Sequence, residues 1–270
     1  MACLPVSRLA LMNATTPNAR ALYSMDRANG AELAEFLTSV PASSGIETSP
    51  NGGDGEVSKS ASIAKRRGGS RNRGDRESVS LTSAQVRNLM ASERHARMIG
   101  LPFTRMLTIH WEAAGVQLEC MAKATGRFTD LMTKVLARHG SSTAWLWVHE
   151  GGPGKGGHCH MLVHVPSKLV SLLLRRQMSW LRRITGKSCR TRVIHSKPIG
   201  GRLGLERSNP ELHAVNLEAA LAYVLKGMDS RAAREFDFTR LEPGGRVIGK
   251  RCGTSQNIGR KARSCWASDQ

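Results

Sequence analysis

Two histidines separated by one residue, His158 and His160, lie in a stretch that is expected to form a β-strand. Successive side chains of a strand point to opposite faces, so both imidazoles should lie on one face, roughly 6 to 7 Å apart along the chain. Two histidines in this arrangement can bind one divalent cation. A His-x-His pair also arises by chance, and in a basic protein the same histidines could contact phosphate instead.

Glu150 is expected to join the two histidines from a neighbouring strand. The predicted hairpin consists of two strands and a glycine-rich turn, at residues 143–150, 158–165 and 151–157. If the hairpin is symmetric about Gly154, Glu150 faces His158, with Cβ atoms about 4.5 to 5.5 Å apart. Two nitrogens and one carboxylate oxygen would suit Mg²⁺ or Mn²⁺. A register shift of one residue would nominate His149 instead, and a solvated carboxylate at the strand end is the alternative role for Glu150.

Tyr223 and Lys226 form the second candidate group, on a predicted helix from Asn216 to Lys226 that ends at Gly227. At 100° per residue, both side chains point away from the apolar stripe, which comprises Leu217, Leu221, Val224, Leu225 and Met228. A tyrosine hydroxyl, with a pKa of about 10, is a poor nucleophile unless a metal and a nearby cation assist it. The alternative is a surface tyrosine next to a lysine.

The motifs together resemble the HUH endonucleases, and more narrowly the replication initiator proteins of plasmids and phages. The resemblance covers roughly residues 103–263 and rests on three motifs, which follow one another in the same order as in the initiator proteins. They are a strand at 103–110, the His-x-His motif at 158–160 and a Tyr-x-x-Lys motif at 223–226. Relaxases usually place the tyrosine before the histidines, and this order disfavours them. The chain departs from the family pattern at two points. Cys159 is smaller than the usual middle residue of the His-x-His motif, and the predicted helix of Tyr223 holds one tyrosine.

The resemblance implies rolling-circle initiation by nicking and strand transfer of single-stranded DNA through a 5'-phosphotyrosine intermediate that leaves a free 3'-hydroxyl. Tyr223 would be the nucleophile, Lys226 the supporting cation, and His158 and His160 the metal ligands. A non-catalytic nucleic-acid-binding module and an HUH-type single-strand transposase or relaxase are the alternative functions.

The chain is strongly basic, with 40 Lys plus Arg against 21 Asp plus Glu, a net charge of +19 and a pI near 10.7 in 270 residues. A polyanionic partner is therefore expected, with single-stranded or origin DNA first. The absence of a Walker A motif suggests that a host helicase, together with a host polymerase, completes replication. The predicted DNA contacts are Thr108, Arg175, Arg176, Arg182, Arg183, Lys250, Arg251, Arg260 and Arg263.

No run of eighteen apolar residues occurs, so no membrane partner is expected and a cytoplasmic location is predicted. The six cysteines are scattered without a C-x-x-C pair, which favours reduced thiols over a zinc module or disulfides.

Periodicity and turn signals predict an α+β fold. Besides the hairpin and the tyrosine helix, the predicted elements are helices near 82–100, 125–139 and 168–185 and strands at 103–111 and 190–196. This order matches the ferredoxin-like, split βαβ plan: an antiparallel sheet with helices on one face. The predicted divisions are a poorly defined segment at 1–40, a disordered basic linker at 41–80, the nuclease domain at 81–245 and a basic C-terminal tail at 246–270.

Overall fold

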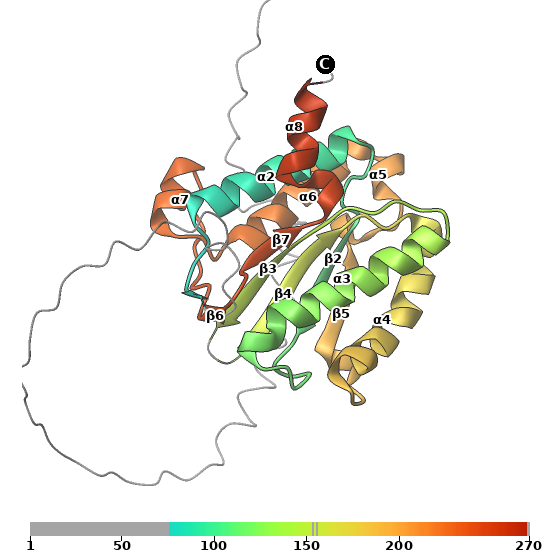
Figure 1. Cartoon of the computed structure of the whole chain (residues 1–270). Helices are drawn as coiled ribbons and strands as arrows, with labels where there is room; N and C mark the ends of the chain where they lie inside the picture. The colour runs from blue at the N-terminus through green and yellow to red at the C-terminus, as the bar shows by residue number, and fades with distance from the viewer. Residues whose placement is uncertain (1–75, 153, 155, 269–270) are drawn as a thin grey trace, which may run out of the picture. The chain divides into compact units, whose positions relative to one another are not determined.

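The computed structural model describes residues 76–152, 154 and 156–268 (Figure 1). The predicted segment 1–40 and all but the last five residues of the predicted linker lie outside this part. Within it, the chain is an α+β protein built on a five-stranded antiparallel sheet. No helix in this described part of the chain combines the length and the apolar character that a bilayer span requires.

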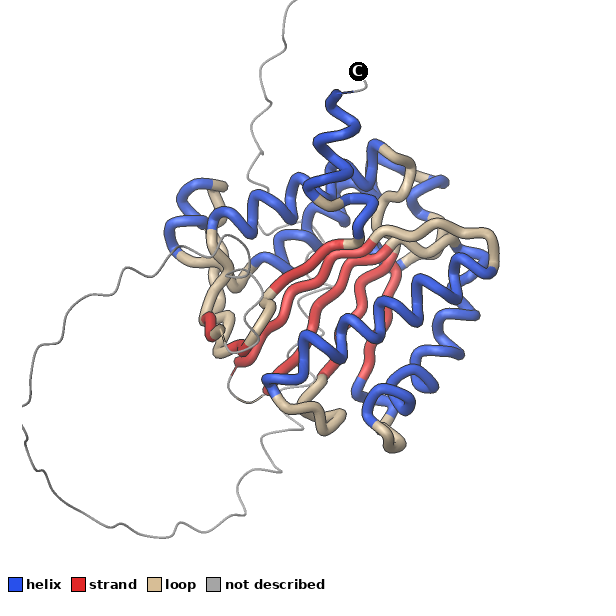
Figure 2. The backbone as a smooth tube through the Cα atoms, in the orientation of Figure 1, coloured by secondary structure: helices blue, strands red, loops and turns tan. Residues whose placement is uncertain are grey.

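The main sheet has the strand order β5-β2-β4-β3-β7, which places β4 between the two strands that α3 connects (Figures 1 and 2). The strand bounds are β2 Arg105–His110, β3 Trp145–Gly152, β4 Gly156–Val163, β5 Ile194–Pro198 and β7 Cys252–Thr254. A separate two-stranded sheet pairs β1 (Glu77–Ser78) with β6 (Val247–Ile248). The end of the predicted linker and the start of the predicted C-terminal tail therefore belong to the fold.

Helices cover both faces of the main sheet, so the prediction of helices on one face was wrong (Figure 2). One face packs against α3 (Met121–Arg138) and α4 (Val170–Thr185), and we call it the α3 face. The opposite face, called the α6 face, packs against α2 (Ser83–Met98) and α6 (Pro210–Leu225). The physical reason lies in β3 and β4, whose central residues are buried on both sides and need apolar cover above and below.

Cover over the α6 face is incomplete at β2. Along this strand the α3-face residues Leu107 and Ile109 are fully buried, whereas Thr108 and His110 on the α6 face are half-buried. Helix α6 contacts β3 and β4, and its buried leucines belong to the same apolar core as Val148. The part of the α6 face formed by β2 and β5 is therefore partly open.

The tyrosine helix begins earlier than predicted. Its N-cap is Asn209, whose side chain accepts a hydrogen bond from the Leu212 amide, and Pro210 occupies the first turn. The predicted cap, Asn216, lies buried inside the helix, where its side-chain amide donates to the carbonyl of Leu212. The Asn-Pro pair was the better start signal, because proline is favoured at the first helical position.

The remaining elements are short. They are α5 (Leu205–Ser208), α7 (Ser230–Glu235), α8 (Arg260–Ser268) and 3₁₀ turns at Leu118–Cys120, Ser167–Leu169, Thr191–Val193, Ile199–Gly201 and Gln256–Ile258. Strand β7 pairs with β3, which extends the sheet by residues that were predicted to form a basic tail. The five cysteines of the described residues are free thiols.

Candidate metal centre and neighbouring tyrosine

Glu150, His158 and His160 form one buried cluster on the α6 face, with ligand atoms all within 4.8 Å of one another. Glu150 pairs with His158 across the hairpin, as the symmetric register about Gly154 predicts. Glu150 Oε2 lies 3.3 Å from His158 Nε2 and 3.6 Å from His160 Nε2. The alternative register, which nominates His149, is excluded because His149 lies on the α3 face, bonded to Thr125.

Hydrogen bonds from the other ring nitrogens orient both imidazoles. His158 Nδ1 lies 2.9 Å from the Gly156 carbonyl oxygen, which can only accept, so Nδ1 carries the proton. In the neutral ring, an unshared electron pair on Nε2 then faces the Glu150 carboxylate. His160 Nδ1 lies 3.0 Å from Thr108 Oγ1, which leaves its Nε2 directed at the same cluster. Such outer contacts are typical of metal-binding histidines.

The donor set fits a divalent cation. Glu150 Oε1 and His160 Nε2 are buried and have no hydrogen-bond partner among the described residues. Burial alone would raise the pKa of Glu150, but the His158 and His160 rings, when protonated at Nε2, and the Lys226 ammonium outweigh it and hold that pKa well below its ordinary value. Burial lowers the pKa of His160, against the opposing effect of Glu150. An ionised carboxylate and a neutral imidazole are the forms that bind metal.

Lys226 joins the cluster from the C-terminal end of α6. Its Nζ lies 3.4 Å from Glu150 Oε2 and 3.1 Å from Glu242 Oε2, and its side chain is only 5% exposed. Burial alone would lower the pKa of Lys226, but the charges of Glu150 and Glu242 outweigh it and raise the pKa above its ordinary value. Lys226 is therefore a fixed cation and not a proton acceptor.

Tyr223 lies against the same cluster. Its half-buried ring packs edge-on to His160, with ring centroids 5.0 Å apart, and Lys226 Nζ lies 4.1 Å from the centroid of the tyrosine ring. The residues of the predicted apolar stripe, by contrast, are all buried in the core below α6. The structure thus brings together the five residues that the sequence nominated for chemistry.

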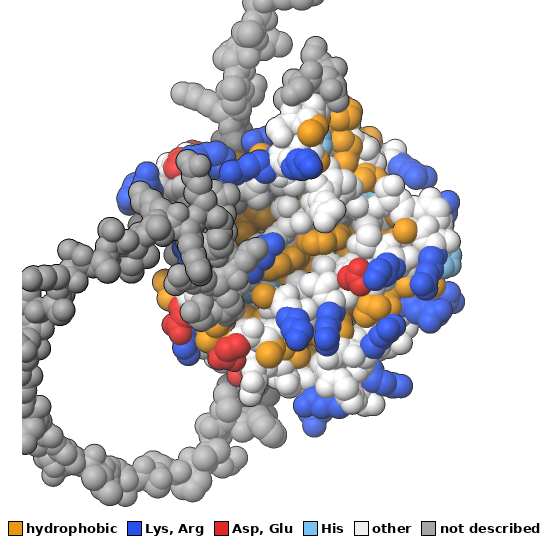
Figure 3. Space-filling model, in the orientation of Figure 1, with side chains coloured by type: hydrophobic (Ala, Val, Ile, Leu, Met, Phe, Trp, Pro, Cys, Tyr) orange, Lys and Arg blue, Asp and Glu red, His pale blue; other side chains and the backbone are white. Residues whose placement is uncertain are grey.

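Most of the predicted DNA-binding arginines lie elsewhere. Arg175, Arg176, Arg182 and Arg183 are exposed on α4, on the face of the sheet opposite the cluster. Lysine and arginine side chains gather over α3 and α4 in Figure 3. The exposed basic residues of these two helices are Lys123, Arg127, Lys134, Arg138, Arg175, Arg176, Arg182 and Arg183, and we call this set the basic helix surface. Lys250 and Arg260 are also exposed.

Two predicted DNA contacts are internal hydrogen-bond donors instead. Arg251 is buried, and its guanidinium donates to Ser78 Oγ at 2.8 Å and to the carbonyls of Gly244 and Gly245 at 3.2 and 2.6 Å. The Arg263 guanidinium donates to Asn88 Oδ1 at 2.7 Å and to Ser92 Oγ at 2.6 Å, which ties α8 to α2. Thr108 is likewise engaged with His160. Sequence cannot separate a solvated basic side chain from one that satisfies buried carbonyls.

Three residues near the cluster were missed. The ring of His110 stacks on His158 at 5.6 Å between centroids and meets His195 of β5 at 5.8 Å. Strand alternation from Thr108 could have identified His110, because the two lie on one face. Glu242 lies in the loop after α7, and no local pattern connects it to Lys226.

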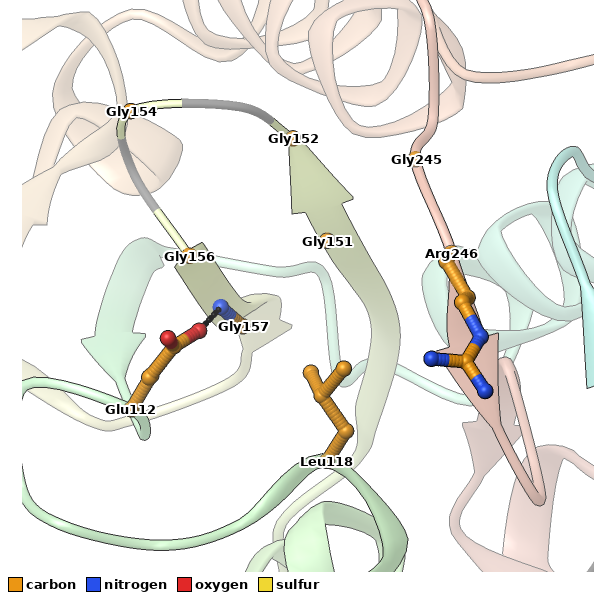
Figure 4. A pocket seen from close by; sticks show the side chains of 9 residues that line it. All are labelled: Glu112, Leu118, Gly151, Gly152, Gly154, Gly156, Gly157, Gly245 and Arg246. Atoms are coloured by element: carbon orange, nitrogen blue, oxygen red, sulfur yellow. Dashed lines mark hydrogen bonds between the residues drawn. The ribbon is translucent and has the colours of Figure 1, made fainter. Parts of the chain in front are cut away.

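Gly151, near the end of β3, lies next to Gly245 of a neighbouring loop (Figure 4). A cavity there is lined by turn glycines together with Glu112 and Arg246, and the Gly157 amide donates to Glu112 Oε2 at 2.6 Å. A Cβ atom on Gly151 would lie 1.9 Å from the Arg246 carbonyl oxygen, so only glycine allows this approach. These contacts fix both ends of the hairpin next to Glu150 and His158.

The fold and site define an α+β protein with a candidate metal centre of one carboxylate and two imidazoles, next to a tyrosine and a lysine. No protein-family model, curated protein or solved structure matches the chain. A function for it is therefore inferred from the geometry of its own residues.

Proposed function

We propose that the protein is a metal-dependent single-stranded DNA endonuclease of the HUH type, which initiates rolling-circle replication through a single tyrosine. The observation that carries the proposal is the position of Tyr223, edge-on to His160 and beneath the Lys226 ammonium. Tyr223, which lies outside the apolar stripe of α6, is thus next to the candidate metal-binding residues of β3 and β4. The strand order 5-2-4-3 within the sheet also supports a ferredoxin-like plan, with β7 as an added edge strand.

Glu150, His158 and His160 would hold Mg²⁺ or Mn²⁺. When bound, such a cation polarises a phosphoryl oxygen and offsets the charge that develops during displacement. Thr108 would position His160 through the Nδ1 hydrogen bond and would act on DNA only indirectly.

Tyr223 would supply the nucleophile. Its phenol oxygen attacks the scissile phosphorus while the bond to the 3'-oxygen breaks, which leaves a 5'-phosphotyrosine and a free 3'-hydroxyl. The phenol proton leaves to solvent and the departing 3'-oxygen takes one up. Lys226, whose raised pKa keeps it charged, favours the phenolate electrostatically and does not accept the proton.

A single strand of DNA would lie across the partly open β2 and β5 region, which the His110 and His195 rings line next to the cluster. The basic helix surface, with Lys250 and Arg260, would attract flanking DNA without sequence preference. Initiation would take place in the cytoplasm, with a host helicase and a host polymerase as partners.

The test compares wild type with Tyr223→Phe on circular single-stranded DNA and random-sequence oligonucleotides in Mn²⁺. Wild type should cleave and retain a covalent nucleotide on Tyr223, identified by mass spectrometry, and EDTA should abolish both. Tyr223→Phe should bind the same DNA and form no adduct. Cleavage by Tyr223→Phe at the wild-type rate would refute the mechanism.

A non-catalytic nucleic-acid-binding module is the alternative, in which strand tryptophans stack on bases. Trp147 is buried and Trp145 is half-buried with its indole nitrogen bonded to Thr133, so neither lies on an open strand face. This arrangement disfavours the alternative. DNA binding by wild type without any adduct would favour it, whereas preference for transposon ends would favour a single-strand transposase.

A further inference from the structure

Glu242 and Glu150 share one ammonium group. Lys226 Nζ lies 3.1 Å from Glu242 Oε2 and 3.4 Å from Glu150 Oε2. The two carboxylates come from distant parts of the chain: Glu150 from β3 and Glu242 from the loop that follows α7. The ammonium is buried, so it depends on these carboxylates for the solvation that water would otherwise supply.

The loop that carries Glu242 is fixed against the end of α6. The Glu242 amide donates to the Lys226 carbonyl at 3.0 Å, and Arg240 Nε donates to Glu242 Oε1 at 2.9 Å. A Cβ atom on Gly227 would lie 3.0 Å from Gly244 Cα, so the loop and the helix end are in close contact. Glu242 is thus held in place by contacts that do not involve Glu150.

Lys226 and a metal cation compete for Glu150. The oxygen that faces Lys226, Oε2, also faces the two imidazole nitrogens of the candidate metal centre. A divalent cation there would repel the nearby ammonium, and removing an ion-pair partner from a buried charge is costly. Glu242 reduces this cost, because Lys226 keeps one carboxylate when Glu150 is taken by the cation.

We infer that Glu242 is a positioning residue, which holds the Lys226 ammonium beside Tyr223 and thereby frees Glu150 to bind a divalent cation. The inference rests on the metal centre of the proposed function and extends it to a residue outside the three motifs. The two carboxylates balance the Lys226 ammonium and the Arg240 guanidinium, so Lys226 keeps a carboxylate partner when Glu150 turns to an incoming cation. Without Glu242 the same group carries one net positive charge, and Lys226 has Glu150 as its remaining carboxylate.

The test is a double-mutant cycle read by Mn²⁺ binding in the absence of DNA, by calorimetry on the full chain. Glu242→Gln should raise the Mn²⁺ dissociation constant roughly tenfold, within the coupling energies of contacting residues. Lys226→Met should lower it, and adding Glu242→Gln to Lys226→Met should change it by less than about twofold. The matched control is Glu235→Gln, which removes an ion pair with Arg87 at a similar side-chain exposure, 31% against 34%, and should leave Mn²⁺ binding unchanged.

Two results would overturn the inference. The first is an unchanged Mn²⁺ dissociation constant in Glu242→Gln. The second is that Glu242→Gln weakens Mn²⁺ binding equally in wild type and in Lys226→Met, which would indicate a long-range charge effect alone. This test is separable from that of the proposed function. If the Mn²⁺ dissociation constants of the variants change as expected but the protein forms no tyrosine adduct, nicking is refuted and the role of Glu242 stands. A wild type that does not bind Mn²⁺ refutes both.

Discussion

Glu150 Oε2 lies 3.3 Å from His158 Nε2 across the β3–β4 hairpin, and the same oxygen lies 3.4 Å from the ammonium of Lys226 on α6. One carboxylate oxygen therefore joins the sheet to the helix that carries Tyr223. Because His158 Nδ1 bonds to a carbonyl, the facing Nε2 of the neutral ring offers an electron pair, and a bound cation would satisfy both this nitrogen and the carboxylate.

Removal of a candidate ligand should weaken metal binding strongly. We expect Glu150→Gln and His160→Ala each to raise the Mn²⁺ dissociation constant by at least about 100-fold, because each deletes one of three candidate ligands from a buried cluster. Calorimetry on the folded variants measures this. His139→Ala, an exposed histidine at the end of α3, should bind Mn²⁺ like wild type. Unchanged affinity in Glu150→Gln would remove the carboxylate from the site.

Thr108 should matter through His160. Thr108→Val keeps the shape of the side chain but deletes the 3.0 Å hydrogen bond to Nδ1, so the ring loses its orientation. Loss of an outer-shell partner typically weakens metal binding about 10- to 100-fold, and we expect the lower end. Thr133→Val, on α3 over the other face, is the control. A Thr108→Val variant with wild-type Mn²⁺ affinity and weakened DNA binding would instead make Thr108 a direct DNA contact.

His149 should make the fold sensitive to acid. Burial lowers its pKa from 6.5 to about 3, more than the Lys250 carbonyl raises it. The folded pKa lies below the unfolded one, so the stabilisation is complete above pH ~6.5 and is lost as the pH falls towards 3. We expect wild type to lose about 2 kcal/mol more unfolding free energy than His149→Gln between pH 7 and 5, from about 1.4 kcal/mol per pH unit below pH ~6.5. Urea titrations at the two pH values measure this, and equal losses would contradict it. His139→Gln should behave like wild type.

Arg251 should stabilise the fold and not bind DNA. Arg251→Met removes the guanidinium donor from the Gly245 carbonyl and one of two donors from the Gly244 carbonyl, and we expect a loss of about 3 to 5 kcal/mol in unfolding free energy. Arg175→Met, from the basic helix surface, should change stability by less than about 0.5 kcal/mol. It should also remove about one phosphate contact, which lowers the magnitude of the slope of the logarithm of the DNA-binding constant against the logarithm of salt concentration by about one. Normal stability in Arg251→Met would contradict this role.

Local patterns determined the central elements, from α2 to β5 together with the tyrosine helix, and part of the site. Alternation along the strands and a glycine turn centred on Gly154 were enough to pair Glu150 with His158, because residue spacing and turn length fix a hairpin's register. The helical period was enough to separate Tyr223 from the apolar stripe of its helix. The cap at Asn209 was missed although its Asn-Pro signal is local.

Tertiary packing decided the rest. Helices on both faces of the sheet follow from the burial of β3 and β4 on both sides, which a hydrophobic run alone does not distinguish from one-sided burial. The meeting of α6 with the hairpin, the approach of Glu242 to Lys226 and the burial of Arg251 all join residues far apart in sequence. The sequence does not distinguish an arginine that faces solvent from one that donates to buried carbonyls, because tertiary packing determines its hydrogen-bond partners.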